Sequence, residues 1–180
     1  MTTILKVLWF LVTPGFANIA AASSGHVIPK FSNPVDFGRT LKGKRILGSH
    51  KTWRGLLFGV IVGMLTFRLQ QKLFIESSFF RGISSFDYQE SSLLLGFFLA
   101  FGASVGDLIK SFIKRRFDIQ PGKSWFPFDQ IDWIVGAIIF GSFLVKLPFS
   151  LILGSLLFGT ILHLISRALG YAVGVNKDII

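Results

Sequence analysis

Acidic, basic and hydroxyl side chains recur at helical spacing in the stretch from Gly102 to Trp133. One set occupies positions i, i+3, i+4, i+7 and i+11, so a helix would bring its members onto one face. This set is Asp107, Lys110, Ser111, Lys114 and Asp118. After a break at Pro121 and Gly122, Asp129 and Asp132 form a second pair at i, i+3. Charges beside long apolar runs are costly unless they face opposite charge, water or a bound ion. We therefore interpret the stretch as a site for a metal-bound nucleotide.

The carboxylates have the spacing of a site for a hard cation. Asp129 and Asp132 can present oxygens to one ion, and Asp107 could approach it from the neighbouring helix. Mg²⁺ typically takes one or two protein carboxylates, and substrate phosphates and water complete its shell. The alternative is a set of structural salt bridges to the nearby bases Lys110, Lys114 and Arg115. Asp118 is expected to be a solvated loop residue.

The basic residues suit phosphate. Lys110, Ser111 and Lys114 share the face of Asp107, whereas Arg116 is expected to contact lipid head groups. Upstream, Lys51 and Thr52 precede an apolar run, where backbone N–H groups at a helix start would suit a triphosphate. This segment resembles a P-loop only loosely, since the Gly-x-x-x-x-Gly-Lys-Thr spacing is missing.

The elements that carry these residues are membrane spans. Of the 180 residues, 51% are hydrophobic, and apolar runs of about 18 to 22 residues match a bilayer core of about 30 Å. We predict an all-α integral membrane protein, a single domain over residues 1–180 with five transmembrane helices. The expected spans are 4–22, 53–75, 93–116, 131–147 and 149–169. A secretory signal peptide is the competing interpretation of the first run.

Basic residues set the expected orientation. Fourteen of the 19 Lys and Arg residues lie in segments 23–54 and 110–130 and in the stretch from Arg167 to the C-terminus. The positive-inside rule then places loops 23–54 and 117–130 and the C-terminus in the cytoplasm, and the N-terminus outside. The net charge of +10 does not indicate nucleic acid, because there is no base-reading module. Because cysteine is absent, disulfides and thiolate chemistry are excluded.

The order of these motifs resembles a signature of the membrane CTP-transferases that make CDP-activated lipids. The matching motifs are Ser111-x-x-Lys114-Arg115, Pro121-Gly122 and Asp129-Gln130-Ile131-Asp132. CDP-diacylglycerol synthases share Ser-x-x-Lys-Arg, followed in them by His-Gly-Gly and Asp-Arg-x-Asp, and they are much longer. This chain lacks His-Gly-Gly and has Gln130 in place of Arg. With Gly106-Asp107 and the stretch Lys51 to Gly55, it is most similar to the archaeal branch, CDP-archaeol synthase.

The resemblance implies a reaction and roles for the residues. CTP and 2,3-bis-O-geranylgeranylglycerol 1-phosphate would give CDP-archaeol and pyrophosphate. With the orientation that the basic residues predict, the reaction would take place in the cell membrane, with the active site facing the cytoplasm. Asp107, Asp129 and Asp132 would hold Mg²⁺. Lys110, Lys114 and Arg115 would neutralise the lipid phosphate and departing pyrophosphate. The remaining substrate-binding residues would be Lys44, Lys51, Thr52, Arg54, Ser111, Pro121 and Gly122.

Two alternatives stay open at this point. One is a CDP-diacylglycerol synthase acting on ester-linked phosphatidate, because nothing in the sequence distinguishes the lipid chains. The other is a small anion transporter, since intramembrane charges also mark ion pathways. A phosphotransferase that consumes CDP-lipids is disfavoured, since its Asp-Gly-x-x-Ala-Arg motif is absent.

Overall fold

Helices make up most of the chain. The structure, a computed structural model, describes residues 2–120 and 123–172. Its helices are α1 (Thr2–Val27), α2 (Trp53–Glu76), α3 (Ser78–Gly82), α4 (Leu93–Arg116), α5 (Phe128–Gly141) and α6 (Phe149–Ala172). A short antiparallel hairpin, β1 (Thr40–Leu41) and β2 (Lys44–Arg45), pairs Thr40 with Arg45. The expectation of an all-α chain is therefore corrected in one place, the loop between α1 and α2.

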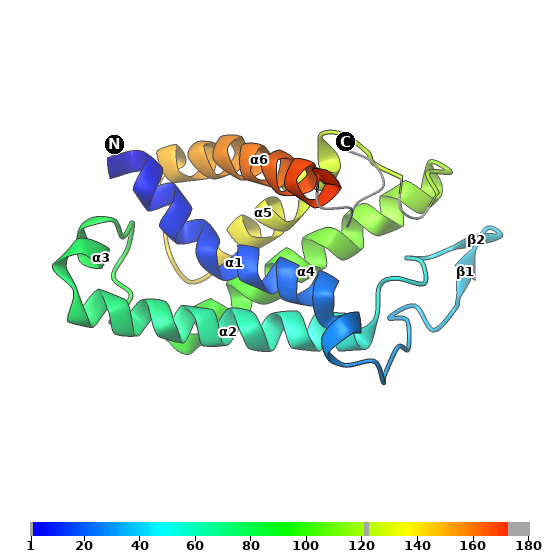
Figure 1. Cartoon of the computed structure of the whole chain (residues 1–180), viewed down its shortest axis with the longest axis horizontal. Coiled ribbons are helices and arrows are strands. Elements are labelled where there is room, and N and C mark those ends of the chain that lie inside the picture. Colours follow the sequence, from blue (N-terminus) through cyan, green and yellow to red (C-terminus); the bar gives the residue numbers. More distant parts are fainter. Residues whose placement is uncertain (1, 121–122, 173–180) are drawn as a thin grey trace.

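The long helices lie side by side and alternate in direction (Figure 1). α1 runs from the end of the molecule near α3 to the end that carries the hairpin, and α2 returns. α4 and α6 then run towards the hairpin end, whereas α5 runs away from it. The loops before α2 and before α5 consequently meet at the same end. That end gathers residues that are far apart in the sequence.

The connecting loops are shorter than predicted. α1 continues to Val27 through Ser23, where the loop was expected to begin, and α5 begins at Phe128. The Ser23 hydroxyl donates to the carbonyl of Ile19 at 2.9 Å, and Ser24 donates to Ala21 at 2.9 Å. Such bonds satisfy serine inside a helix, so these polar residues do not end it. The loops therefore span residues 28–52 and 117–127.

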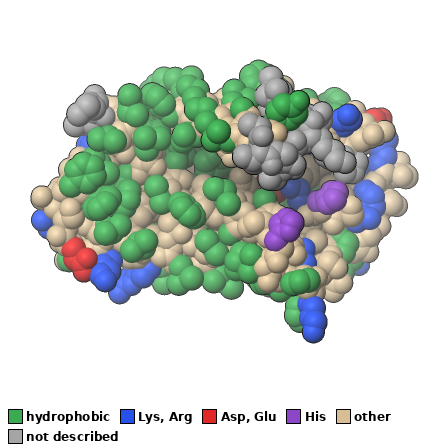
Figure 2. Space-filling model, viewed as in Figure 1, with side chains coloured by type: hydrophobic (Ala, Val, Ile, Leu, Met, Phe, Trp, Pro, Cys, Tyr) green, Lys and Arg blue, Asp and Glu red, His purple; other side chains and the backbone are tan. Residues whose placement is uncertain are grey.

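Within the described residues, four helices are long and apolar enough to cross a membrane, namely α1, α2, α4 and the Phe149–Ser166 part of α6. α5, in the place of the expected span 131–147, has 14 residues and a length of about 21 Å. On α2, Leu57, Ile61, Leu65 and Leu69 form an outward stripe, each more than half exposed. Figure 2 shows hydrophobic side chains over the length of the molecule and cations towards its ends. A large exposed apolar surface of this kind fits a multi-pass membrane protein.

Glycines bring α4 and α5 into backbone contact. A Cβ atom added at Gly106 would overlap the carbonyl oxygen of Asp132, and one added at Gly136 would overlap that of Gly102. Small residues allow helices in membranes to approach this closely. The contact brings the turn of α5 that carries Asp132 against the turn of α4 that carries Asp107.

Candidate active site

Asp36 organises the loop between α1 and α2. Its carboxylate, which is fully buried, accepts bonds from the Arg45 guanidinium at 2.7 and 3.3 Å. It also accepts from the amides of Gly38, Leu47 and Gly48 at 3.0, 3.0 and 3.2 Å. Burial alone would raise the pKa of Asp36, but the bonds from Arg45 and the amides hold this pKa well below its usual range.

The same loop is joined to the start of α2. The amide of Val35 donates to the Lys51 carbonyl at 2.7 Å, and the amide of Trp53 donates to Asn33 at 3.0 Å. Thr52 is the N-cap of α2, and its hydroxyl accepts from the Gly55 amide at 3.2 Å. Lys51 therefore enters the site directly before a helix start.

Arg54 connects α2 to the end of α1. Its guanidinium donates to the carbonyls of Ile28 at 2.7 Å, Pro29 at 3.1 Å and Lys30 at 3.4 Å. These three carbonyls belong to the residues that directly follow α1, so the charged donor fixes the chain where it leaves that helix. Arg54 thus stabilises the wall of the site as well as lining it.

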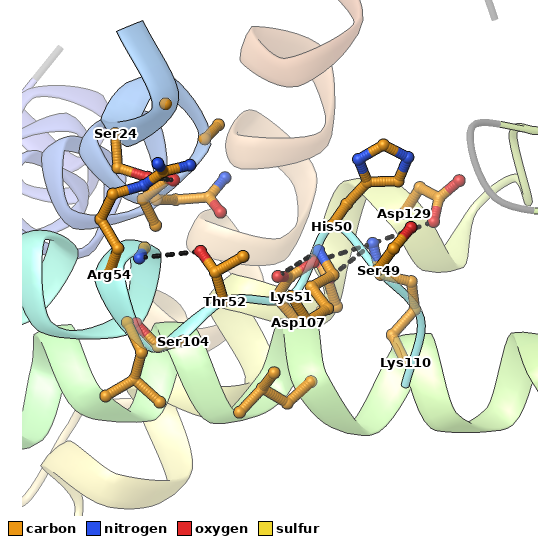
Figure 3. Close-up of a pocket in the computed structure, with 18 of the residues that line it drawn as sticks. Ser24, Ser49, His50, Lys51, Thr52, Arg54, Ser104, Asp107, Lys110 and Asp129 are labelled. Atoms are coloured by element: carbon orange, nitrogen blue, oxygen red, sulfur yellow. Dashed lines mark hydrogen bonds and ion pairs between the residues drawn. The ribbon is translucent and has the colours of Figure 1, made fainter. Parts of the chain in front are cut away.

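Lys110 lies at the centre of three carboxylates. Its ammonium is 3.1 Å from Asp107 Oδ1, 3.1 Å from Asp129 Oδ1 and 3.0 Å from Asp132 Oδ2. The Lys51 ammonium reaches Asp107 Oδ2 at 2.5 Å from the loop (Figure 3). These groups come from α4, α5 and the loop between α1 and α2, so the tertiary fold assembles the cluster.

Lys114 extends the cluster towards the connection between α4 and α5. Its ammonium lies 2.9 Å from Asp129 Oδ2 and 2.5 Å from the carbonyl oxygen of Lys123. The Trp125 amide donates to Asp129 Oδ2 at 2.6 Å. Lys51, Lys110 and Lys114 together balance the charge of the three aspartates. The arrangement contains the salt bridges to Lys110 and Lys114 that the sequence offered as the alternative to a metal site. The third base is Lys51, and Arg115 makes no ion pair among the described residues.

Two adjoining cavities flank this cluster. The larger, about 520 Å³, lies between α1, the start of α2, α4 and α5. Ser24, Thr52, Arg54, Asp107 and Asp132 are among the residues that line it. Ser49 and His50 also face it from the loop (Figure 3).

The smaller cavity, about 230 Å³, is strongly basic. Its cations are Lys51, Lys110, Lys114, Arg115 and Lys123. Asp129 contributes to both cavities, as do Lys51 and Lys110. The two spaces therefore meet at the charged cluster. A basic cavity beside converging carboxylates can hold a polyanion together with a cation.

Most of the predicted site residues meet around these cavities. Those that line one or both are Lys51, Thr52, Arg54, Asp107, Lys110, Ser111, Lys114, Arg115, Asp129 and Asp132. Lys44 does not line either cavity, because it turns to Asp118 and pairs with it at 2.5 Å. Pro121 and Gly122 lie outside the described residues.

Arg116 differs from the sequence expectation. It donates to the carbonyls of Leu41 at 2.8 Å and Arg45 at 2.7 Å, so it clamps the hairpin to the end of α4. The sequence had suggested that it contacts lipid head groups. Asp118 is exposed, as expected, and pairs with Lys44.

The structure also adds residues that the motifs missed. Ser24, Ser49, His50 and His163 line the larger cavity, and Lys123 lines the smaller one. The sequence could have indicated His50, because it directly precedes the predicted site residue Lys51. His163 offered no such signal, since it stands alone in an apolar run more than thirty residues from Asp129.

Comparison with known proteins agrees with this architecture. The fold resembles a solved structure described as an intramembrane enzyme for archaeal membrane lipid biosynthesis, with a TM-score of 0.66 and 24% sequence identity. The similarity covers 87% of this chain and 92% of the other.

Sequence relatives cover nearly the whole chain. The CDP-archaeol synthase of Methanocaldococcus jannaschii is 34% identical over 173 residues, covering 96% of this chain and 94% of that protein. The enzyme of Pyrococcus furiosus is 35% identical, with 95% of each chain covered. That of Archaeoglobus fulgidus is 41% identical over 143 residues, covering 77% of this chain and 74% of that protein. A family model described as CarS-like, CDP-archaeol synthase, matches residues 1–180. The chain therefore belongs to the CDP-archaeol synthase family of CTP-dependent cytidylyltransferases.

Proposed function

We propose that this enzyme transfers CMP from CTP to 2,3-bis-O-geranylgeranylglycerol 1-phosphate, giving CDP-archaeol and pyrophosphate. An oxygen of the lipid phosphate bonds to the α-phosphorus of CTP. The bond from that phosphorus to the bridging oxygen of the β-phosphate breaks, and pyrophosphate leaves. The observation that carries the proposal is the meeting of a basic cavity and three carboxylates at one end of bilayer-length helices.

The side chains supply alignment and charge neutralisation. The lipid phosphate is ionised at neutral pH, so it attacks without a dedicated base. The main obstacle is the repulsion between two polyanions, which fixed cations in a water-poor site reduce. Lys114 and Arg115, in the basic cavity, neutralise the β- and γ-phosphates and then the pyrophosphate. Ser111, buried on the same wall, donates its hydroxyl to a phosphate oxygen.

The larger cavity takes the lipid phosphate. Thr52 and Arg54 line its α2 side and Lys110 its α4 side, so an anion there lies next to the charged cluster. Lys51 and Lys110 line both cavities and lie between the two substrates. This placement lets the same two ammonium groups offset charge on the attacking and the departing phosphates.

The aspartates fit a Mg²⁺ ion by their chemistry. Within residues 2–120 and 123–172, no group of three or more His, Asp or Glu side chains is arranged closely enough to hold a metal. Three carboxylates nevertheless point at one cation, the Lys110 ammonium, and hard oxygen donors are the ligands Mg²⁺ prefers. We propose that Asp107, Asp129 and Asp132 hold Mg²⁺ once Lys110 turns towards phosphate. When bound, the ion would offset charge on the CTP phosphates.

The cytoplasmic side of the molecule is the end that carries the hairpin. We propose five crossings, with α5 and residues 142–148 together forming the fourth, and the N-terminus outside. The alternating directions of α1, α2, α4, α5 and α6 support this count (Figure 1). The basic loop 28–52 at the hairpin end supports the orientation by the positive-inside rule. CTP would then reach the site from the cytoplasm.

The test measures pyrophosphate release by the purified protein from CTP and the lipid phosphate, with Mg²⁺ or with EDTA. We expect pyrophosphate release to need Mg²⁺. In Asp129→Asn and Asp132→Asn the rate of release should fall at least 100-fold, because removing a preorganised charge typically costs about 10²- to 10³-fold. Asp87→Asn, which changes an exposed carboxylate at the α3 end, should release pyrophosphate like wild type. Equal release by wild type and both site variants would remove these aspartates from the reaction.

A lipid panel tests the substrate. The isoprenoid ether phosphate should outcompete ester-linked diacyl phosphatidate for CMP transfer. A preference for phosphatidate would make the enzyme a CDP-diacylglycerol synthase. Membership in a family of cytidylyltransferases already disfavours the anion transporter.

A further inference from the structure

Asp36 has no place in the proposed chemistry, yet among the described residues it is the most extensively bonded carboxylate outside the cluster. It lies in neither cavity. Five hydrogen bonds converge on its two oxygens, two from Arg45 and three from backbone amides. It is also the one acid among seven bases in residues 23–54. Without a counter-charge, such a loop repels itself and has no apolar core to order it.

The bonds around Asp36 lead directly to Lys51. Asp36 fixes the amide of Gly48, and the Gly48 carbonyl accepts from the Lys51 amide at 3.3 Å. On the other side, the Lys51 carbonyl accepts from the amide of Val35, the neighbour of Asp36. The backbone of Lys51 is thus held from both directions by the segment that Asp36 orders.

The position of the Lys51 backbone matters because the lysine side chain is long and flexible. Its ammonium group is directed to one place only when the backbone that carries it is held. The Lys51 ammonium reaches Asp107 at 2.5 Å only from a loop of defined shape. Gly48 has φ of 115°, a left-handed conformation that glycine adopts without strain but does not enforce. The bond from the Gly48 amide to Asp36 therefore helps to hold this conformation.

We propose that Asp36 is a positioning residue for CMP transfer, which acts by holding Lys51 against Asp107. The inference rests on the proposed function, in which Lys51 contacts the phosphates. Asp36 itself touches neither substrate. Its loss should leave the protein folded, because Arg116 anchors the hairpin to α4 independently, through the carbonyls of Leu41 and Arg45.

The test is a double-mutant cycle between Asp36→Asn and Lys51→Ala in the purified full-length protein. We expect Lys51→Ala to lower kcat about 100-fold, as for loss of a preorganised charge, and Asp36→Asn to lower it about 10-fold or more through misplacement. Both should lower kcat by a larger factor than they raise KM for CTP, because Lys51 lies between the two cavities, where charge moves from the attacking to the departing phosphate. If Asp36 acts through Lys51, the double variant should be no slower than Lys51→Ala alone.

Independent effects would instead multiply, and a double variant slower than Lys51→Ala by the full Asp36→Asn factor would overturn the inference. So would a fully active Asp36→Asn. Asp87→Asn is the matched control, since Asp87 also accepts two backbone amides, at 2.8 and 3.1 Å, in a loop at the far end. It should retain wild-type kcat.

One further variant, and the activity of Lys51→Ala itself, keep the outcome interpretable. If Asp36→Asn fails to purify as a folded protein, Arg45→Ala removes two of the five bonds and should show the same non-additivity with Lys51→Ala. A fully active Lys51→Ala would contradict the proposed function at Lys51. Loss of activity in Lys51→Ala together with a multiplicative Asp36→Asn effect would contradict the positioning role alone.

Discussion

Lys110 on α4 and Asp132 on α5 meet at 3.0 Å beside one of the closest backbone contacts in the described helices, that of Gly106 with the Asp132 carbonyl. The side-chain pair and the glycine contact depend on each other. A wider helix separation would move Asp132 out of reach of Lys110. The charged cluster is therefore held by backbone packing as well as by attraction between charges.

Lys110→Ala should destabilise the protein and make its stability depend on Mg²⁺. The change leaves Asp107, Asp129 and Asp132 facing one another with little solvent, since their side chains are at most 22% exposed. Removing one partner of a buried ion pair typically costs about 3–5 kcal/mol. We expect a lower Tm in EDTA and substantial recovery with millimolar Mg²⁺, both measured by thermal unfolding in detergent.

Lys72→Ala is the matched control for that experiment. Lys72 pairs with Glu76 at 3.9 Å with both side chains more than half exposed, so its loss should cost about 1 kcal/mol or less. Its Tm should not respond to Mg²⁺ beyond the wild-type response. An unchanged Tm in Lys110→Ala would show that the carboxylates are not held together by this ammonium.

Gly106→Ala should lower activity in a protein that remains in the membrane. The added methyl group would meet the Asp132 carbonyl oxygen, so α5 must move away from α4. A displacement of about 1 Å can cost about 100-fold in rate, and we expect a loss of that order in CMP transfer. Gly82→Ala, where a Cβ meets nothing within 4 Å, should keep full activity. Wild-type turnover in Gly106→Ala would show that the helix contact does not set the site.

The charged helix face could be predicted from the sequence, because the 3.6-residue period of a helix determines which side chains share one face. Asp107, Lys110, Ser111 and Lys114 all lie on the cavity side of α4. Asp129 and Asp132 could be placed near them since a short connection brings α5 back along α4. The relation between residues on one helix, or on two consecutive helices, is local in the chain. Residue spacing and loop length are therefore enough to predict it.

Lys44 shows what could not be predicted. Its direction depends on the turn between β1 and β2, where Lys42 and Gly43 have φ of 52° and 76°. That turn directs Lys44 to Asp118 instead of the cavities. The sequence also did not show the length of α5, because residues 133–145 are apolar except for Ser142, whereas the helix ends at Gly141. Composition alone does not distinguish the helix from the apolar turn that follows it.

Arg115→Ala should weaken product inhibition by pyrophosphate. Arg115 lines the basic cavity at the end of α4 and makes no ion pair among the described residues, so its charge is available to an anion. We expect the inhibition constant for pyrophosphate to rise about 10-fold, since a charged hydrogen bond is worth about 1.5–3 kcal/mol. Initial-rate assays with added pyrophosphate would measure it. Arg81→Ala, exposed at the α3 end, should leave inhibition as in wild type, and equal inhibition in Arg115→Ala would place pyrophosphate elsewhere.

Asp36 should keep the loop ordered down to about pH 4 and lose this effect in stronger acid. A carboxyl whose pKa is lower in the folded state stabilises that state fully above its unfolded pKa, about 3.9, and the contribution is lost as pH falls through the folded pKa. The measurement is amide hydrogen exchange of the segment 38–48 as a function of pH, corrected for the intrinsic exchange rates. Protection should be constant from pH 7 to 5 and fall below about pH 4.

Asp36→Asn separates this carboxyl from other groups in the loop. The variant cannot titrate at position 36, so its segment 38–48 should exchange faster than wild type at pH 7 and show no further acid step. Amides inside α2, which do not contact Asp36, should stay equally protected in both proteins. Loss of protection in wild type already near pH 6 would show that a group other than Asp36 controls the order of the loop.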